Sequence, residues 1–227
     1  KYVCRVPPIG STKVVSMPTW KQITESNPQH SFNYAQRWDR IAAEGKDIYG
    51  EARLVDALLD RKSRILDAGC GQGRIGGYLA DHGHSVTGVD VDPYLIDVAR
   101  DRHPGATWEV ADLVEGDLPA GPFDAIISTG NVFTFLAPGT QKAALERLAP
   151  LLAPRGRMAI GFGLDRGYSF DQFHSDWQAV ELRSSLLLES WDLRPYIPGR
   201  STFIVAILER DEAPQKPSVD LGMLRKL

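Results

Sequence analysis

The sequence has little of what would place it in a membrane, metal-binding or disulfide-rich class. No apolar run approaches the roughly 18 residues that a membrane span requires, and no signal peptide is evident at the N-terminus. Only two cysteines occur, Cys4 and Cys70, so we expect no disulfide and infer a reducing cytoplasm. No Cys/His cluster has metal-ligand spacing, which predicts no metal site.

The charge balance gives little reason to expect a nucleic-acid partner. The formal net charge is −3 over 227 residues. Apolar residues make up 43% and charged residues 24%, as in ordinary globular proteins. We expect a flexible arm at 1–30, one domain at 31–210 and a tail at 211–227. The predicted protein has no membrane or nucleic-acid partner and is a monomer or homodimer.

The most informative stretch is residues 65–74, which read Ile-Leu-Asp-Ala-Gly-Cys-Gly-Gln-Gly-Arg. An apolar run is followed by an acid and three glycines, and an amphipathic segment comes next. This order predicts a strand, a tight turn and a helix. Glycines permit positive φ and allow a ligand to approach the backbone closely. In an open α/β sheet such a turn lies at the carboxyl end of a strand, where cofactors bind.

Two ligand classes compete for this turn. Residues 71–76 fit the dinucleotide pattern G-x-G-x-x-G, and Asp90 lies near the distance expected of a ribose-binding acid. In that pattern the first glycine directly follows the strand, which here is Gly69, and the third position then falls on Arg74. Asp67 would also set a carboxylate at the mouth of a pyrophosphate site. The sequence therefore favours a cationic ligand over a dinucleotide.

Residues 67–73, Asp-Ala-Gly-Cys-Gly-Gln-Gly, closely resemble the first motif of class I S-adenosylmethionine (SAM) methyltransferases. SAM carries an amino group and a sulfonium but no phosphate, which agrees with the local charge. The resemblance extends over about two-thirds of the chain. It implies an α/β, Rossmann-like fold with a seven-stranded, mostly parallel sheet, helices on both faces and an antiparallel last strand. It also implies SAM as cofactor and S-adenosylhomocysteine (SAH) as product.

The hydrophobic patterns predict alternating strands and helices that fit this fold. Strands are expected at 64–67, 84–90, 107–111, 123–128 and 156–162, with an antiparallel pair at 182–193 and 202–210. Helices are expected at 32–43, 49–59, 74–81, 93–102 and 139–152, and a loop at 161–175. The resemblance implies that helices within 31–60 form a lid over the cofactor.

Acids end three successive predicted strands, at Asp67, Asp90 and Asp112. The resemblance implies that Asp90 accepts the ribose hydroxyls and that Asp112 receives the adenine amino group. A helix-capping role for Asp90 is the alternative, although Asp92 is better placed to cap the helix beginning at Pro93. The predicted cofactor-binding residues are Asp67, Gly69, Cys70, Gly71, Gln72, Gly73, Asp90, Val91, Ala111, Asp112, Leu113 and Ser128.

The segment after the fourth strand, residues 128–133, reads Ser-Thr-Gly-Asn-Val-Phe. It lacks the proline pair found in relatives that methylate amino groups or nucleobases, which argues against that chemistry. Aromatic and amide side chains suggest a small-molecule pocket, with a purely structural packing role left open for the aromatic ones. The predicted substrate-binding residues are Trp38, Tyr49, Asn131 and Phe133.

An acceptor hydroxyl or ammonium would require a base. The predicted base is His174 in the loop after the fifth strand, with His30 as a second choice and a surface role as the alternative. The resulting prediction is a SAM-dependent methyltransferase that transfers a methyl group to a small molecule by direct in-line displacement. Two alternatives remain at this point: a SAM-binding protein without catalysis, and an NAD-dependent oxidoreductase, against which Asp67 argues.

Overall fold

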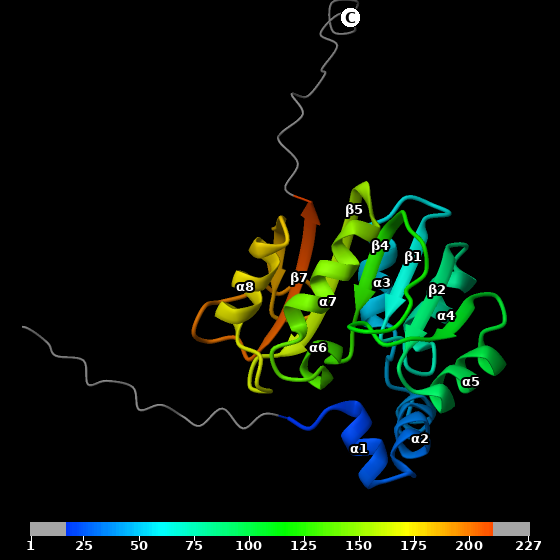
Figure 1. The fold of residues 1–227 in the computed structure, drawn as a ribbon. Helices are drawn as coiled ribbons and strands as arrows, with labels where there is room; N and C mark the ends of the chain where they lie inside the picture. The colour runs from blue at the N-terminus through cyan, green and yellow to red at the C-terminus, as the bar shows by residue number, and fades with distance from the viewer. Residues whose placement is uncertain (1–16, 211–227) are drawn as a thin grey trace, which may run out of the picture.

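A computed structural model describes residues 17–210 of the chain, which form one seven-stranded sheet with helices on both faces (Figure 1). The order of the strands is β3-β2-β1-β4-β5-β7-β6. Their bounds are β1 (Arg64–Ala68), β2 (Ser85–Asp90), β3 (Thr107–Val110), β4 (Phe123–Ser128), β5 (Leu152–Gly163), β6 (Leu182–Leu188) and β7 (Phe203–Arg210).

The sheet is parallel except at β7. Strand β1 pairs in parallel with β2 and β4, β2 with β3, and β4 with β5. Strand β7 runs antiparallel to both β5 and β6. In Figure 1 the arrowheads of β1 and β4 point toward α1 and α2, whereas β7 points away. The predicted Rossmann-like sheet, with its antiparallel last strand, is therefore confirmed.

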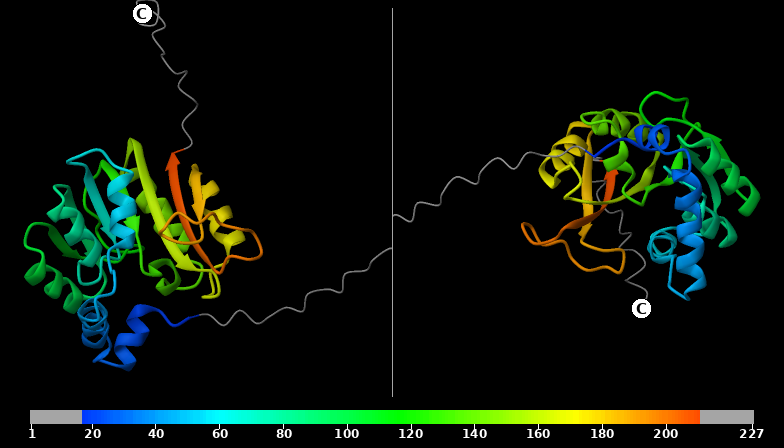
Figure 2. Two further views of the ribbon diagram at one scale, coloured as in Figure 1. Left: turned by 180° about the vertical axis from the view of Figure 1, so that it is seen from behind. Right: turned by 90° about the horizontal axis from the view of Figure 1, so that it is seen from below.

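Helices cover the sheet and one of its ends. Helices α3 and α4 pack on one face, α7 and α8 on the other, while α1 and α2 lie across the end where the parallel strands terminate (Figure 2). None of the helices in residues 17–210 is long and apolar enough to cross a membrane. Their bounds are α1 (Trp20–Ser26), α2 (His30–Ala43), α3 (Gly50–Ala57), α4 (Arg74–Asp81), α5 (Pro93–Arg102), α6 (Val132–Phe135), α7 (Gln141–Leu148), the 3₁₀ turn η1 (Ala149–Leu151) and α8 (Phe170–Ala179).

Alternating side chains along the strands contribute to two hydrophobic cores, one on each face of the sheet. Ile65 and Ile127 are buried on the face toward α3 and α4, whereas Leu66 and Ile126 are buried on the face toward α7 and α8. Because successive residues of a strand point to opposite faces, both sides of a covered parallel sheet become apolar. The central strands are therefore fixed in register, which fixes where their carboxyl ends emerge.

The prediction of a flexible arm at 1–30 is wrong for its described part. Residues 20–26 form α1, and α2 begins at His30. Thr19 accepts the backbone N–H of Gln22, whose side chain in turn accepts the N–H of Thr19, so a capping box starts α1. The short helix has no buried residue of its own to produce a hydrophobic period, which is why the apolar pattern did not indicate it.

The predicted loop at 161–175 is also wrong in part. Strand β5 continues to Gly163, and α8 begins at Phe170. A second capping box, formed by Ser169 and Gln172, starts this helix. The loop is therefore limited to 164–169. The remaining predictions for the arm, for the tail at 211–227 and for Cys4 lie outside the described residues.

Candidate active site

The glycine turn between β1 and α4 has the backbone that its sequence predicts. Gly69, Gly71 and Gly73 all have positive φ, at 85°, 54° and 79°. A Cβ on Gly69 would lie 2.5 Å from the methyl groups of Val132. Only glycine fits this position, because both its dihedral angles and the space beside it exclude a side chain. The turn is thus held close against the segment that follows β4.

Asp90 closes this turn from the end of β2. Its Oδ2 accepts the N–H of Gly71 at 2.8 Å, and its Oδ1 accepts the N–H of Asp92 at 2.9 Å. Burial is the main reason that the pKa of Asp90 rises to about 6, against the opposing effect of these backbone N–H groups. A carboxylate offers about four lone-pair sites. Asp90 therefore keeps acceptor capacity for hydroxyl groups in the cavity that it lines.

Asp67 lies beneath the turn rather than on the wall of the cavity. It is 1% exposed, and its Oδ2 accepts the N–H of Gly76 at 3.0 Å while its Oδ1 has no partner. Burial raises the pKa of Asp67 to about 7, and the Gly76 N–H and the charge of Arg74 oppose that rise. The predicted direct cofactor contact of Asp67 is not what the geometry shows, because the carboxylate turns toward the first turn of α4.

Asp112 follows β3 and meets an unpredicted partner, Lys21 of α1. The Lys21 Nζ lies 2.6 Å from Asp112 Oδ2, and Asp112 Oδ1 accepts the N–H of Val114 at 2.9 Å. Burial would raise the pKa of Asp112, but the hydrogen bonds from Lys21 and Val114 lower it below its ordinary value. The carboxylate predicted to meet adenine is therefore held ionised at the edge of the cavity.

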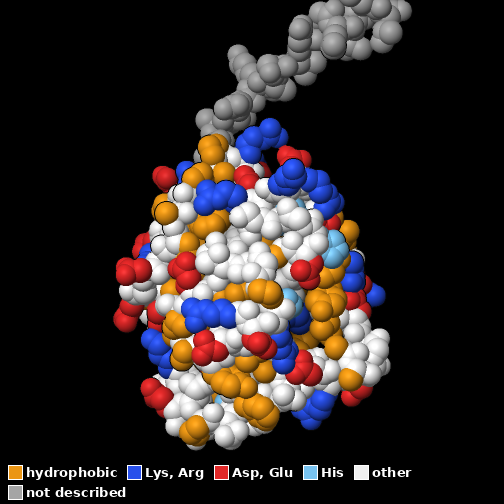
Figure 3. Space-filling view, turned by 90° about the vertical axis from the view of Figure 1, so that its right-hand side faces the viewer, with side chains coloured by type: hydrophobic (Ala, Val, Ile, Leu, Met, Phe, Trp, Pro, Cys, Tyr) orange, Lys and Arg blue, Asp and Glu red, His pale blue; other side chains and the backbone are white. Residues whose placement is uncertain are grey.

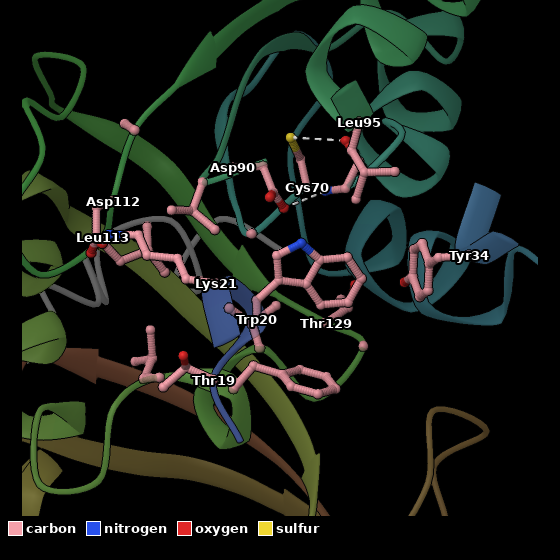
Figure 4. Close-up of a pocket in the computed structure, with 18 of the residues that line it drawn as sticks. Thr19, Trp20, Lys21, Tyr34, Cys70, Asp90, Leu95, Asp112, Leu113 and Thr129 are labelled. Carbon is pink, nitrogen blue, oxygen red and sulfur yellow. Dashed lines mark hydrogen bonds and ion pairs between the residues drawn. The ribbon is translucent and has the colours of Figure 1, made fainter. Parts of the chain in front are cut away.

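These groups surround one cavity of about 260 Å³ at the carboxyl ends of the strands (Figure 4). It collects most of the predicted cofactor residues. Those on its wall are Gly69, Cys70, Gly71, Gln72, Asp90, Val91, Ala111, Asp112 and Leu113. Gly73 is the residue before α4 and Ser128 is a buried residue at the end of β4, and neither lies on the wall.

Besides Asp67 Oδ1, two polar atoms near the turn have no hydrogen-bond partner within the described residues. Gln72, which lines the cavity, is 5% exposed, and its Oε1 is buried without a donor. Ser128 Oγ, at the end of the strand beside β1, is likewise buried without one. Buried polar groups are normally satisfied, so these atoms leave hydrogen-bonding capacity unused in the packing around the turn.

Helices α1 and α2 and the segment after β4 supply an aromatic wall. Trp38 lines the cavity, as predicted, and its ring stacks under the guanidinium of Arg74 at 3.9 Å. Tyr34, Trp20 and Phe135 line it as well and were not predicted. The ring of Trp20 lies 5.3 Å from that of Tyr34 and 5.6 Å from that of Phe135, both edge to face. Aromatic rings at these distances attract each other beyond their simple burial.

Three predicted substrate residues lie elsewhere. Tyr49 packs on Tyr78 at 5.0 Å, away from the cavity. Asn131 has φ 69° and accepts the N–H of Gly163 at 2.8 Å, which ties the loop after β4 to the end of β5. Phe133 is fully buried among the core aromatics. Helix α6 turns Phe133 into the core and leaves Phe135, two residues later, at the cavity.

His174, the predicted base, does not reach the cavity. It lies on the exposed side of α8, stacked on Phe170 at 5.9 Å and edge-on to Trp177 at 5.0 Å. The expected loop is a helix here, and its inner face carries Phe173 and Trp177 instead. The second choice, His30, packs on Trp20 at 5.0 Å and is not on the cavity wall.

Comparison with known proteins defines the family. A model described as a methyltransferase domain matches residues 65–156. A solved TehB-like SAM-dependent methyltransferase from Corynebacterium glutamicum is 50% identical, with a TM-score of 0.78, over 81% of this chain and 100% of that one. The chain therefore belongs to the SAM-dependent methyltransferases.

Other relatives of this chain carry names with different acceptors. The magnesium-protoporphyrin O-methyltransferase of Rhodobacter capsulatus is 34% identical over 63% of this chain and 61% of that protein. An 18S rRNA (guanine-N(7))-methyltransferase of Bos taurus is 39% identical over 32% of this chain and 26% of that protein. The chain spans about half, 54%, of the mycobacterial methyltransferases that it matches.

Proposed function

We propose that this chain transfers the methyl group of SAM to a small-molecule acceptor by direct in-line displacement. The observation that carries the proposal is the convergence of the glycine turn, Asp90 and Asp112 on one cavity. They come from the ends of the adjacent strands β1, β2 and β3. The opposite wall is aromatic. A polar, acid-bearing half and an apolar half suit a nucleoside cofactor and an organic acceptor respectively.

The residues present fit the cofactor. The turn at Gly69 and Gly71 offers backbone without side chains, and Asp90 retains acceptor capacity for the ribose hydroxyls. Asp112 and the backbone of Leu113 would receive the adenine. Gln72 lies on the same wall, with its unpaired Oε1 buried behind it. We therefore assign these six residues to cofactor binding.

The mechanism requires alignment more than side-chain chemistry. When bound, the sulfonium of SAM supplies an already activated methyl group. The chain must hold the acceptor in line at roughly 3–3.5 Å and exclude water. Trp20, Tyr34 and Phe135 form the apolar surface that would do both. Because burial raises the pKa of Tyr34, its hydroxyl stays protonated and can donate a hydrogen bond to the acceptor.

The charges of the aromatic half are already paired, which favours an acceptor with an uncharged, planar body. Arg74 is 8% exposed and bonds Glu51 at 2.9 and 3.0 Å, and Lys21 bonds Asp112. The face in Figure 3 carries acidic and basic side chains intermixed, without one broad basic patch. Together with the formal net charge of −3, the mixed charge of this face supports a small molecule over a nucleic acid. A monomer or homodimer in the cytoplasm stays a prediction.

The test is turnover with a panel of acceptors. Full-length protein is incubated with SAM and with planar phenols, thiols, carboxylic acids, amines and an RNA oligonucleotide, and SAH formation is measured. Asp90→Ala should abolish turnover. The control Asp97→Ala should not, because Asp97 is an exposed acid on α5 whose partner is Arg100. Methylation of RNA alone would contradict the small-molecule acceptor. Tight SAH binding without turnover of any acceptor would favour a non-catalytic SAM-binding protein.

A further inference from the structure

Asp92 is a buried carboxylate that serves three helices at once. It is 6% exposed. Its Oδ1 caps α5 by accepting the N–H groups of Tyr94 and Leu95 at 3.0 and 3.3 Å. Its Oδ2 accepts the indole N–H of Trp20 at 2.8 Å and the hydroxyl of Ser31. The first pair of bonds caps α5, and the second pair joins α1 and α2 to the start of that helix.

The same residue is joined to the ribose side of the cavity. The backbone N–H of Asp92 donates to Asp90 Oδ1 at 2.9 Å, and Asp90 Oδ2 accepts from the glycine turn. On its other side, the ring of Trp20 forms the aromatic wall with Tyr34 and Phe135. An unbroken chain of contacts thus leads from Asp90 through Asp92 to Trp20. Figure 4 shows the carboxylate of Asp90 and the rings of Trp20 and Tyr34 around the same cavity.

We propose that Asp92 is a positioning residue that couples cofactor binding at Asp90 to the placement of Trp20 in the acceptor wall. The proposal rests on the proposed function. A ligand that engages Asp90 fixes the loop carrying Asp92, and Asp92 in turn fixes α1 through the Trp20 indole and α2 through Ser31. Binding of the cofactor therefore tightens the wall against which the acceptor must sit, and an empty cofactor site leaves that wall looser.

Coupling of this kind is reciprocal. If SAH lowers the equilibrium constant for opening of α1 by some factor, closure of α1 must tighten SAH binding by the same factor. A variant in which α1 is released should therefore lose SAH affinity by the factor by which SAH protects α1 in the unmodified protein. A typical coupling is about fivefold or more. A change that destabilised the whole fold, and not the docking of α1 in particular, would not be expected to produce equal factors in the two measurements.

Asp92→Asn is the variant that releases α1 with the least disturbance. The amide has the same shape, and its oxygen can still cap α5. Its NH₂ group then faces the indole N–H of Trp20, which places two donors together. Trp20→Phe is the second variant, since it keeps an aromatic ring in the wall while it removes the N–H donor and makes the ring smaller. Trp191→Phe is the matched control. Trp191 lies in the segment that connects β6 to β7, where its ring lies beside Gly161, outside the cavity.

The experiment measures hydrogen exchange of residues 20–26 with and without SAH, alongside SAH titration calorimetry, on the full-length protein. In the unmodified protein SAH should slow exchange in α1 about fivefold or more. Asp92→Asn and Trp20→Phe should each lose that protection and weaken SAH binding by the same factor, while Trp191→Phe should behave as the unmodified protein.

The outcomes separate the two proposals. SAH binding with no change in α1 exchange, or full protection of α1 in both variants, would overturn the role of Asp92 and leave the cofactor assignment intact. Failure of the unmodified protein to bind SAH would instead overturn the proposed function. If Asp92→Asn does not fold, Trp20→Phe decides the matter alone. In that case, equal SAH affinity for Trp20→Phe and the control overturns the coupling.

Discussion

Asp67 makes the stability of this protein depend on pH in a direction that is unusual for a carboxylate. The side chain is 1% exposed, one oxygen has no partner within the described residues, and burial raises the pKa from its ordinary value of 3.8 to about 7. Between these values the unfolded chain carries an ionised carboxylate while the folded protein holds a proton. Unfolding then releases a proton, so raising the pH favours unfolding.

The magnitude follows from the two pKa values. They are about three pH units apart, and each unit is worth about 1.4 kcal/mol, so this one residue should cost up to about 4 kcal/mol by pH 7. The cost is nearly absent below pH 4 and complete above about pH 7. Asp67→Asn cannot ionise and keeps an oxygen for the N–H of Gly76. It should therefore remove this contribution.

Urea unfolding of the ligand-free protein and of Asp67→Asn between pH 4.5 and 8 tests this prediction. The free energy of unfolding of the unmodified protein, minus that of the variant, should fall by several kcal/mol as the pH rises. The exposed acid Asp97, changed to Asn, should show no such trend. A flat difference for Asp67→Asn would refute the reasoning, since it would mean that Asp67 is ionised in the folded protein at low pH.

Three further predictions concern the turn, the aromatic wall and the discarded base. Gly69→Ala should abolish SAH binding in calorimetry and destabilise the fold by about 1–3 kcal/mol, because its Cβ meets Val132. Adding Val132→Ala should restore part of the stability by removing this contact. The cost of the positive φ at residue 69 should remain. Arg74→Met should lower the free energy of unfolding by about 3 kcal/mol or more, as measured by thermal unfolding. The reason is that the partly buried Glu51 loses its ion-pair partner. His174→Ala should leave SAM turnover unchanged, and a hundredfold loss would restore His174 as the base.

The central sheet and the polar half of the cavity could be predicted from the sequence because their signals are local. Apolar runs ending in Asp67, Asp90 and Asp112 mark strand ends, and glycines mark the only turn that could follow β1. Parallel strands bring such ends to one edge of the sheet, so the fold itself gathers the residues. The predicted sheet was therefore enough to predict a site at the strand end that carries Asp90.

The aromatic half of the cavity could not be predicted, because it depends on the rotation of short helices. Phe133 and Phe135 are both plausible pocket residues in the sequence, and only the orientation of α6 sends one to the core and the other to the cavity. Trp20 and Lys21 lie in a segment without hydrophobic periodicity, although the capping residues Thr19 and Gln22 do carry a helix-start signal. His174 was assigned to a loop because a helix-start signal was again overlooked: Ser169 and Gln172 form the capping box that begins α8.

Calorimetric titration of the full-length protein with SAH, SAM and NADH, repeated with Asp90→Ala and the control Asp97→Ala, tests the cofactor assignment most directly. We predict micromolar binding of SAH and SAM, lost in Asp90→Ala and kept in the control, and no binding of NADH. Binding of NADH alone, or SAH binding that is indifferent to Asp90, would contradict the assignment of this cavity to SAM.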